Sequence, residues 1–285
     1  MDFAPEVRAA DRNAYLTILF APEAVRPALY ALCAYGLELD RIVARAREPL
    51  AAEVRLQWWR DAIRGEGYGE GAAAAPLVAA LFEARATFGW PADTLAAMSD
   101  ARIHDLYADP FDTLDDFDGY AGEVHSLPLQ LAAIAMAVHG RGAVAGSAVA
   151  RSAASAAGYG GVALAAADTL LTETARLAAG RTHIPRTVWQ ETGAPPIEEL
   201  LAAATTPAGF ADALRALARH GLAADERMTA ELASVDTEAR GALLPALWAR
   251  PILEAGLKRP LDVRAPGPLR AQWRIWRNAR SLAKG

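Results

Sequence analysis

Long alanine- and leucine-rich segments, separated by glycine and proline residues, constrain the fold of this chain more than any other feature. Alanine and leucine are among the strongest helix formers, whereas the aromatic residues that favour strands make up only 7% of the chain. No stretch alternates apolar and polar residues with the period of two that marks a half-buried strand. The 285 residues suffice for one large core. The sequence therefore predicts an all-α fold, with a single domain over residues 1–285.

Net charge, cysteine content and hydropathy indicate which partners and which cellular compartment to expect. The formal net charge is −5, whereas a nucleic-acid binder needs a basic field that displaces counterions from phosphate. The lone Cys33 excludes an internal disulfide, and its place beside Leu29 and Leu32 predicts a buried thiol. The sequence shows neither a secretion signal nor an apolar run of membrane-spanning length. We therefore expect a cytoplasmic protein with no nucleic-acid partner.

The histidines give no indication of a metal site. Metal sites built on histidine need ligands at characteristic spacings, such as two histidines four residues apart on one helix. The histidines of this chain lack such spacings; they are His104, His125, His139, His183 and His220. We therefore predict that none of them holds a metal ion.

Local signals mark two features of the helices. Thr113 or Asp112 is predicted to cap a long helix that runs to about Val138, because short polar side chains accept hydrogen bonds from free backbone N–H groups. The helical stretch that follows contains Gly158, Gly160 and Gly161. Glycine weakens a helix by up to about 1 kcal/mol, so we expect these three to permit close helix packing.

Four segments in a fixed order carry a resemblance to a known family. They are APEAVRPALYALCAYGLELDRI at 21–42, EPLAAEVRLQWWRDAI at 48–63, DTLDDFDGYAGEVHSLPLQLAA at 112–133 and GYGGVALAAADTLLTETARLAAGRTHIP at 158–185. Together they span most of the chain and resemble the squalene/phytoene synthase family. The resemblance implies an isoprenoid-synthase fold, which is a single helical bundle around a central cavity. In active members that cavity receives two prenyl diphosphates.

The chemistry of that family depends on two D-x-x-x-D motifs. Carboxylates four residues apart share one helix face, where they hold Mg²⁺ against a diphosphate. By the resemblance, the first motif keeps Asp40, its adjacent second carboxylate falls on Arg41, and its last aspartate falls on Ala44. The two aspartates of the second motif fall on Thr172 and Arg176. Because an arginine repels a cation, the resemblance implies that these vestigial positions no longer support the usual catalysis.

Three functions remain open on the sequence. The first is a protein that has lost Mg²⁺-dependent prenyl transfer and acts by binding, with no cofactor. In support of this first function, the segments RLQWWRDAI and YAGEVHSLPLQL of this chain resemble bacterial relatives of a mitochondrial complex I assembly factor. That resemblance implies a protein partner in respiratory-complex assembly. The second is an active enzyme that condenses two prenyl diphosphates head to head, with Mg²⁺ held by Asp40, Asp168 and the acids of 105–118. The third is a protein that binds a prenyl diphosphate or another prenyl lipid.

Four residues are the candidates for contact with a bound prenyl compound. Tyr120 lies in the third resembling segment, and Asp168 stands where the family usually has an amide. Arg41 and Arg181 carry guanidinium groups, which bind a diphosphate as bidentate donors, and Arg176 has the same capacity. The alternative for these arginines is that they form ion pairs that close the cavity.

Two further features have both a functional and a structural interpretation. Asp105 and Asp109 form a D-x-x-x-D pattern that offers a substitute metal site. Acids before a helix-breaking proline are more typical of a solvated turn and of helix caps, and we favour that interpretation. Trp58 and Trp59 either line the cavity or place one tryptophan in the core, with Arg60 paired at the surface. We favour the structural interpretation here as well.

The C-terminal segment 267–283 has the pattern of an amphipathic helix. Leu269, Trp273 and Trp276 follow the spacing i, i+4, i+7, with a stripe of arginines beside them. Such a helix suits contact with an anionic bilayer, which would make the protein peripheral to the inner membrane. The structural interpretation, which we favour, is a last bundle helix with Trp273 and Trp276 packed on the core.

Overall fold

The computed structural model describes residues 1–66, 75–202 and 206–283, and within these ranges it contains helices and no strand. The predicted all-α class is confirmed. The α-helices are, in chain order, α1 (Ala4–Ala10), α2 (Arg12–Ile18), α3 (Arg26–Ala44), α4 (Pro49–Arg64), α6 (Pro76–Phe88), α7 (Ala92–Ala101), α8 (Leu114–Ala121), α9 (Leu127–Arg141), α10 (Ala143–Ser152), α11 (Ala154–Ala178), α12 (Arg186–Glu191), α13 (Ile197–Ala202), α14 (Phe210–Glu231), α15 (Thr237–Arg240), α16 (Ala249–Lys258) and α17 (Pro268–Leu282). Short 3-10 or π-helical turns join several of them: η1 (His104–Leu106), η2 (Gly122–Ser126), η3 (Gly241–Leu243), η4 (Ala246–Trp248) and η5 (Pro260–Asp262).

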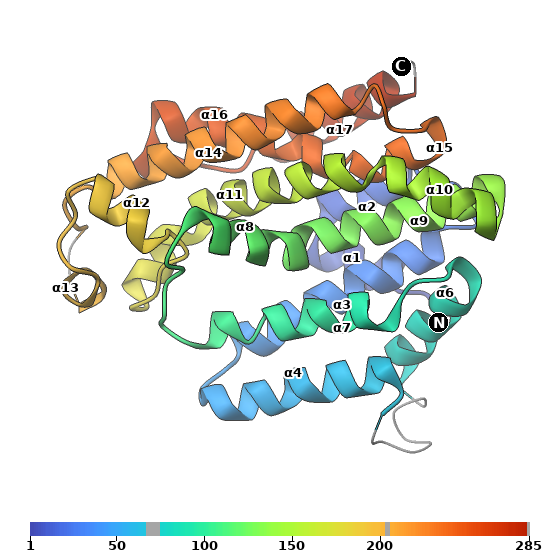
Figure 1. Cartoon of the computed structure of the whole chain (residues 1–285), viewed down its shortest axis with the longest axis horizontal. Coiled ribbons are helices and arrows are strands. Elements are labelled where there is room, and N and C mark those ends of the chain that lie inside the picture. Colours follow the sequence, from blue (N-terminus) through green and yellow to red (C-terminus); the bar gives the residue numbers. More distant parts are fainter. Residues whose placement is uncertain (67–74, 203–205, 284–285) are drawn as a thin grey trace.

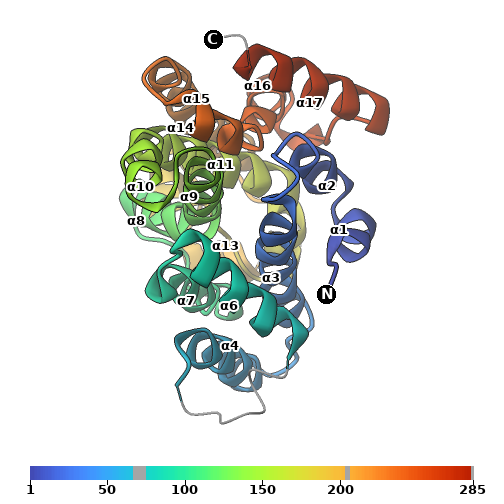
Figure 2. The ribbon, with the colours of Figure 1, turned by 90° about the vertical axis from the view of Figure 1, so that its right-hand side faces the viewer.

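The helices stack in layers around α11 (Figure 1). Helices α14 and α16 pack on one side of α11, and α9 with η2 packs on another. Helices α3 and α7 lie beyond α9, and α4 lies at the far end of the stack (Figure 1, Figure 2). Buried apolar residues form two main clusters, one around α3, α4, α6, α7 and α9 and the other around α11, α14 and α16. The candidate site lies where α3, α7, α9 and α11 come together.

The helix predicted after Thr113 begins where expected and runs without a break to Arg141, with a π-helical turn inside it. Thr113 Oγ1 accepts a hydrogen bond from Asp116 N at 3.2 Å, and the Asp116 carboxylate accepts one from Thr113 N at 2.9 Å. This reciprocal capping box satisfies two backbone donors at the start of α8. The chain then passes through the π-helical turn η2 before α9 begins, and Pro128, which has no N–H to donate, follows directly.

One helix in the described ranges is long and apolar enough to cross a membrane, by length and composition alone. It is the continuous run Leu114–Arg141, which joins α8, η2 and α9 over 28 residues. Its most apolar window is 56% buried inside the protein. Burial in the bundle accounts for this composition, because a helix enclosed by other helices is apolar on most of its faces.

Two of the three glycines near the start of α11 lie where another segment comes close. A Cβ atom on Gly161 would meet the backbone nitrogen of Ser126 at 2.6 Å, and one on Gly160 would meet Ala246 Cβ at 2.8 Å. Close packing is therefore confirmed at these two positions. A Cβ atom placed on Gly158 would have no neighbour within 4 Å, so the expectation of close packing is wrong at that position.

Alanine at Gly161 and at Gly158 should have opposite effects on stability. Gly161→Ala forces the backbone of η2 away from α11, so we expect the free energy of unfolding to fall by about 1–3 kcal/mol. Gly158→Ala meets no neighbour and restricts the unfolded chain, so we expect a gain of up to about 1 kcal/mol. Urea denaturation followed by far-UV circular dichroism measures both changes. Equal destabilisation by the two substitutions would contradict the packing described above.

The C-terminal helix α17 packs on the bundle through the face opposite to the expected one. Ala271, Ile275 and Leu282 are its buried residues, and the helix contacts α2 and η4. Trp273 is 55% exposed and Trp276 is 47% exposed. The interpretation that these tryptophans pack on the core is therefore wrong. A small residue such as Ala271 lets α17 approach its neighbours closely, whereas an inward indole would hold the helix away from them.

Candidate functional site

An apolar cavity of about 320 Å³ lies between α3, α9 and η3. One face of α3 supplies a stripe of lining residues at helical spacing, from Leu29 through Gly36 to Asp40. The polar residues of the lining are Asp11, Thr17, Asp40, Arg102 and His125, and most of the others are apolar. The cavity is therefore an apolar chamber whose wall becomes charged where α3 reaches Asp40.

Asp40 is held by an arginine at this end of the cavity. Arg102, which follows α7 directly, forms a close ion pair with Asp40 through Nη2. Its Nη1 donates to Tyr120 Oη at 2.9 Å and pairs with Asp105 Oδ2 at 3.1 Å. Enclosure by the surrounding helices raises the pKa of Asp40, and Arg102 opposes that rise. The retained carboxylate of the first predicted motif thus already has a cationic partner.

Two other titratable side chains in the cavity wall are uncharged at neutral pH. Burial lowers the pKa of His125 to about 4 and raises the pKa of the Cys33 thiol to about 12. The thiol, predicted to be buried, is in fact half-buried at the cavity wall. Because neither group carries charge at neutral pH, the Asp40–Arg102 pair sets the electrostatic character of this end.

Next to this ion pair, Asp105 is the centre of a buried network. Asp105 is 5% exposed. Its carboxylate accepts a hydrogen bond from Tyr120 Oη at 2.8 Å and lies 2.8 Å from His183 Nε2. Its backbone oxygen accepts a hydrogen bond from Arg181 Nη1 at 2.9 Å. Burial favours a higher pKa for Asp105, but His183, Arg102 and Tyr120 outweigh burial and hold that pKa below its usual range.

The D-x-x-x-D pattern from Asp105 to Asp109 does not form a helix face. The turn η1 ends at Leu106, and Tyr107 has an extended backbone, so the two carboxylates do not stack. Asp109 is exposed, as the solvated-turn interpretation predicts. That interpretation is wrong for Asp105, because its partners from distant segments offset the cost of burying the charge.

The positions of the second predicted motif adjoin the same network from α11. Arg176 Nε donates to Thr172 Oγ1 at 3.2 Å, and Arg176 Nη2 lies 3.9 Å from Asp168 Oδ2. Arg176 Nη1 lies 3.0 Å from His183 Nε2. The structure thus brings Asp168, Thr172 and Arg176 together and connects them to Asp105 through the imidazole of His183.

A second buried carboxylate, Glu173, fixes the loop that carries Arg181 and His183. Glu173 is fully buried and accepts hydrogen bonds from Thr182 Oγ1 and, at 3.2 Å, from His183 N. Burial raises the pKa of Glu173, and the bond from Thr182 opposes the rise. The sequence offered one signal for this residue, an acid among the small apolar residues of an alanine-rich helix.

The charges at this end do not match the ligand shell of a Mg²⁺ ion. Mg²⁺ favours an octahedron of oxygen ligands, usually carboxylates and water. Here Asp40 is paired with Arg102 and Asp168 faces Arg176, so each carboxylate already meets a guanidinium group. Ala44 has no ligand atom to offer. Among the residues that the structure describes, no three His, Cys, Asp or Glu side chains group as metal ligands do.

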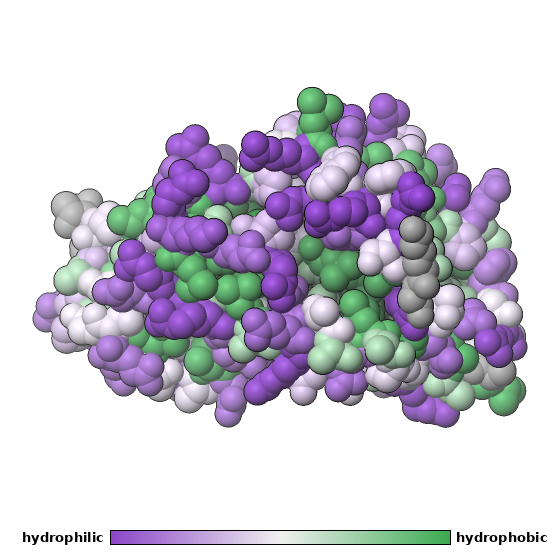
Figure 3. Space-filling view, turned by 90° about the horizontal axis from the view of Figure 1, so that it is seen from above, coloured by the Kyte–Doolittle hydropathy of each residue, from purple (hydrophilic) through white to green (hydrophobic). Residues whose placement is uncertain are grey.

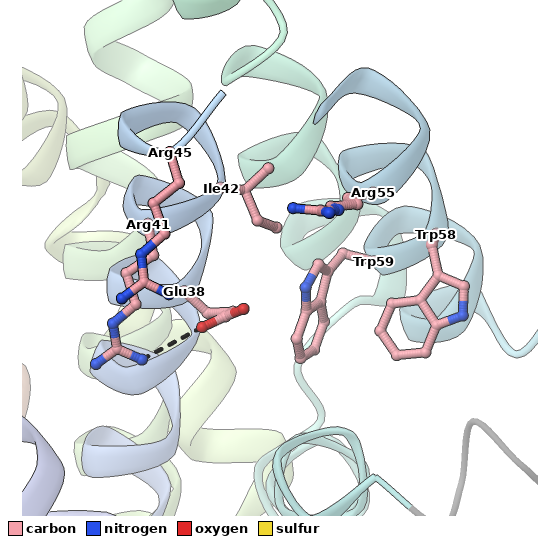
Figure 4. Close-up of a pocket in the computed structure, with 7 residues that line it drawn as sticks. All are labelled: Glu38, Arg41, Ile42, Arg45, Arg55, Trp58 and Trp59. Carbon is pink, nitrogen blue, oxygen red and sulfur yellow. Dashed lines mark hydrogen bonds and ion pairs between the residues drawn. The ribbon is translucent and has the colours of Figure 1, made fainter. Parts of the chain in front are cut away.

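Arg41 lies apart from this network, in a separate pocket between α3 and α4 (Figure 4). Arg41 Nη1 pairs with Glu6 Oε1 at 2.5 Å and with Glu38 Oε2 at 3.2 Å. The structure therefore does not bring Arg41 together with the other candidate binding residues. The remaining residues that line this pocket are Ile42, Arg45, Arg55, Trp58 and Trp59.

The two adjacent tryptophans line this outer pocket and not the central cavity (Figure 4). Trp59 is 8% exposed and packs against Tyr35 with ring centroids 5.4 Å apart. Arg60 pairs with Asp61 at 2.9 Å on the outside of α4. The structural interpretation, with one tryptophan in the core and a surface ion pair beside it, is confirmed.

Loss of the Asp105 carboxylate should cost much more stability than loss of Asp109. Asp105→Ala removes one buried carboxylate partner of Arg102 and the acceptor of His183 and Tyr120. Because this leaves buried polar groups without partners, we expect a loss of about 3–5 kcal/mol in the free energy of unfolding. Asp109→Ala, at an exposed position, should change it by less than about 0.5 kcal/mol. Urea denaturation at neutral pH measures both.

The cost of Asp105→Asn should also depend on pH. The pKa of Asp105 is lowered in the folded protein, so the charge stabilises the fold above the ordinary carboxyl pKa of about 3.9. That contribution is lost as the pH falls from there towards the lower folded value. The difference in unfolding free energy between the wild type and Asp105→Asn should therefore shrink below about pH 4. A difference that grows with acidity would contradict the assignment.

Solved structures of similar fold include squalene and dehydrosqualene synthases. The crystal structure of squalene synthase HpnC from Alicyclobacillus acidocaldarius matches with a TM-score of 0.68 and 21% identity, over 90% of this chain and 92% of that one. A dehydrosqualene synthase in complex with a ligand matches with a TM-score of 0.73 and 14% identity, over 99% of this chain and 95% of that one. The complex of TcSQS with the ligand E5700 matches with a TM-score of 0.65 and 14% identity, over 99% of this chain and 88% of that one. These likenesses confirm the predicted isoprenoid-synthase fold.

Sequence comparison identifies the family independently of the structures. No curated protein sequence matches the chain. The family model described as squalene/phytoene synthase matches residues 7–277, which include the cavity, the Asp105 network and most of α17. The chain therefore belongs to the squalene/phytoene synthase family.

Proposed function

We propose that this protein binds a prenyl lipid in its apolar cavity and does not carry out Mg²⁺-dependent prenyl transfer. The observation that carries the proposal is the cavity itself, which is apolar along α3 and α9 and ends at an arginine–carboxylate pair. Its volume of about 320 Å³ is in the range of small-molecule sites. Each methylene group that such a site removes from water contributes about 0.8 kcal/mol.

The charges support a lipid whose polar end is neutral or weakly charged. A diphosphate carries several negative charges and needs an excess of cations or bound metal. At this end Arg102 is matched by Asp40 and Asp105, and Arg176 faces Asp168. The guanidinium groups of Arg102 and Arg176 are therefore already paired with carboxylates, which supports a prenyl alcohol or similar lipid over a free prenyl diphosphate.

A turnover assay distinguishes this proposal from an active prenyltransferase. Purified protein is incubated with farnesyl or geranylgeranyl diphosphate, Mg²⁺ and NADPH, and diphosphate and apolar products are measured. We expect no release of diphosphate, because Asp40 and Asp168 are engaged by arginines. A new apolar product, lost in Asp40→Ala, would refute the proposal and support a head-to-head prenyltransferase with a rearranged metal site.

Filling the cavity should abolish lipid binding without loss of stability. Gly36 lines the cavity, and a Cβ atom placed on it meets nothing within 4 Å. Gly36→Leu should therefore fold at least as stably as the wild type, because glycine is unfavourable inside a helix. Geranylgeraniol at a hundredfold excess over its Kd should stabilise the wild type by about 2.7 kcal/mol, and we expect Gly36→Leu to lose most of that gain in thermal unfolding.

Gly119→Leu is the matched control for this experiment. Gly119 also lies inside a helix, and a Cβ atom placed on it has no neighbour within 4 Å, but this glycine is exposed and outside the cavity. The variant should keep the full lipid-dependent gain. Equal gains in both variants, or no gain in the wild type with any prenyl alcohol or diphosphate, would refute the cavity as the binding site.

We further propose a role in the assembly of respiratory complex I as the cellular use of this binding. The support is the resemblance of RLQWWRDAI and YAGEVHSLPLQL to bacterial relatives of a complex I assembly factor. The test is deletion of the gene in its host, followed by native electrophoresis of membranes stained for NADH dehydrogenase activity. We expect less assembled complex, restored by the wild-type gene and by Gly119→Leu but not by Gly36→Leu. Unchanged complex I in the deletion strain would refute this role.

A further inference from the structure

Helix α17 has two apolar faces, and the fold uses only one of them. Ala271 and Ile275 point into the bundle. At 100° per residue, Trp273 lies about 200° around the helix from Ala271, on the opposite side. Leu269 is 81% exposed on that outer side, beside Trp273 and Trp276. Burial in the bundle therefore does not account for the second apolar face.

The outer face is strongly basic in a chain that is acidic as a whole. Between Pro268 and Leu282 the helix has four arginines and no acidic residue, whereas the net charge of the chain is −5. In the described part of the chain none of the four forms an ion pair. The arginines are Arg270, Arg274, Arg277 and Arg280.

The arginines and tryptophans are arranged as adjacent pairs. The guanidinium carbon of Arg277 lies 4.8 Å from the ring centroid of Trp273, and that of Arg280 lies 4.7 Å from the ring centroid of Trp276. Such stacking keeps each cation at the level of the indole. Indole rings and guanidinium groups at one level match the boundary of a bilayer, where the acyl chains end and the phosphates begin.

The position of α17 leaves this face accessible. The helix lies along one end of the molecule, next to α2 and opposite α4 (Figure 2). Seen from above, the surface shows hydrophilic residues around separate apolar patches (Figure 3). A single helix that presents tryptophan, leucine and arginines without ion-pair partners fits a flat, negatively charged surface with an apolar interior.

We propose that α17 binds the surface of a bilayer that contains anionic phospholipid. Leu269, Trp273 and Trp276 enter the boundary between headgroups and acyl chains, and Arg270, Arg277 and Arg280 contact lipid phosphates. Ala271 and Ile275 hold the helix on the protein throughout, so binding requires no unfolding of the bundle. This proposal does not depend on what the cavity binds or on whether the protein is catalytic.

The test is sedimentation of the full chain with vesicles of phosphatidylcholine alone or mixed with phosphatidylglycerol. We expect at least tenfold stronger binding to the anionic vesicles, with a decrease at high salt because the arginine contacts are screened. Trp273→Ala/Trp276→Ala and Arg270→Glu/Arg277→Glu should each weaken binding at least tenfold. Brominated lipid should quench tryptophan fluorescence in the wild type more than in Trp273→Ala/Trp276→Ala.

Matched controls separate the helix from general surface effects. Leu50 and Val54 are exposed apolar residues of α4, and Leu50→Ala/Val54→Ala should bind as the wild type does. Arg47→Glu/Arg151→Glu makes the same change of charge at exposed arginines outside α17 and should also keep most binding. Circular dichroism verifies the fold of every variant.

Three results would overturn the proposal. The first is equal sedimentation with both kinds of vesicle, and the second is unchanged binding by the tryptophan variant. The third is a dimer in sedimentation velocity that Trp273→Ala/Trp276→Ala converts to a monomer, because the face would then belong to a second copy of the chain. None of these results affects the separate test of the cavity, in which Gly36→Leu is expected to lose the gain in stability that the lipid gives the wild type.

Discussion

The buried carboxylate of Asp105 is the interaction on which the charged end of the cavity depends. It joins Arg102 after α7, Tyr120 on α8 and His183 in the loop after α11. A carboxylate that is 5% exposed would be costly alone, but three donors satisfy it. The ion pair with Asp105 holds the Arg102 side chain in place, and in that position Arg102 also pairs with Asp40. The buried charge of Asp105 therefore determines that the Asp40 carboxylate at the cavity wall has an arginine partner.

In this arrangement arginine side chains balance the carboxylates that gather at one end of the bundle. In a bundle of carboxylates alone, repulsion would raise their pKa values or require a cation. Here guanidinium groups supply the positive charge, Arg102 from the end of α7 and Arg176 from α11. A guanidinium is held covalently by the chain, so the pairing does not require a bound metal ion. The cavity beyond these pairs is apolar because most of the side chains that line it are apolar.

The sequence predicts the helices well because their signals are local. The capping box of Thr113 depends on residues three apart in the sequence. The glycines of α11 indicate close packing, but the sequence does not name the partner of Gly161, Ser126, which lies far along the chain. The Asp105 network depends on segments far apart, and no periodicity marks Arg102 or His183 as its partners. In α17 the sequence shows an amphipathic pattern but has apolar residues on two sides. Only the packing shows that Ala271 faces inward and Trp273 outward.

The inner face of α17 and the central cavity share a boundary. Ile275 and Asn278 line a pocket of about 170 Å³ whose other walls include Ala14, Thr17 and Leu164, and these three also line the cavity. A helix that rests on a bilayer would therefore place the α2 side of the cavity close to the membrane surface. An apolar lipid crosses water poorly, because each exposed methylene group is unfavourable there. The proposed lipid site and the proposed bilayer contact are therefore neighbours in the fold, because α2 packs between α17 and the cavity.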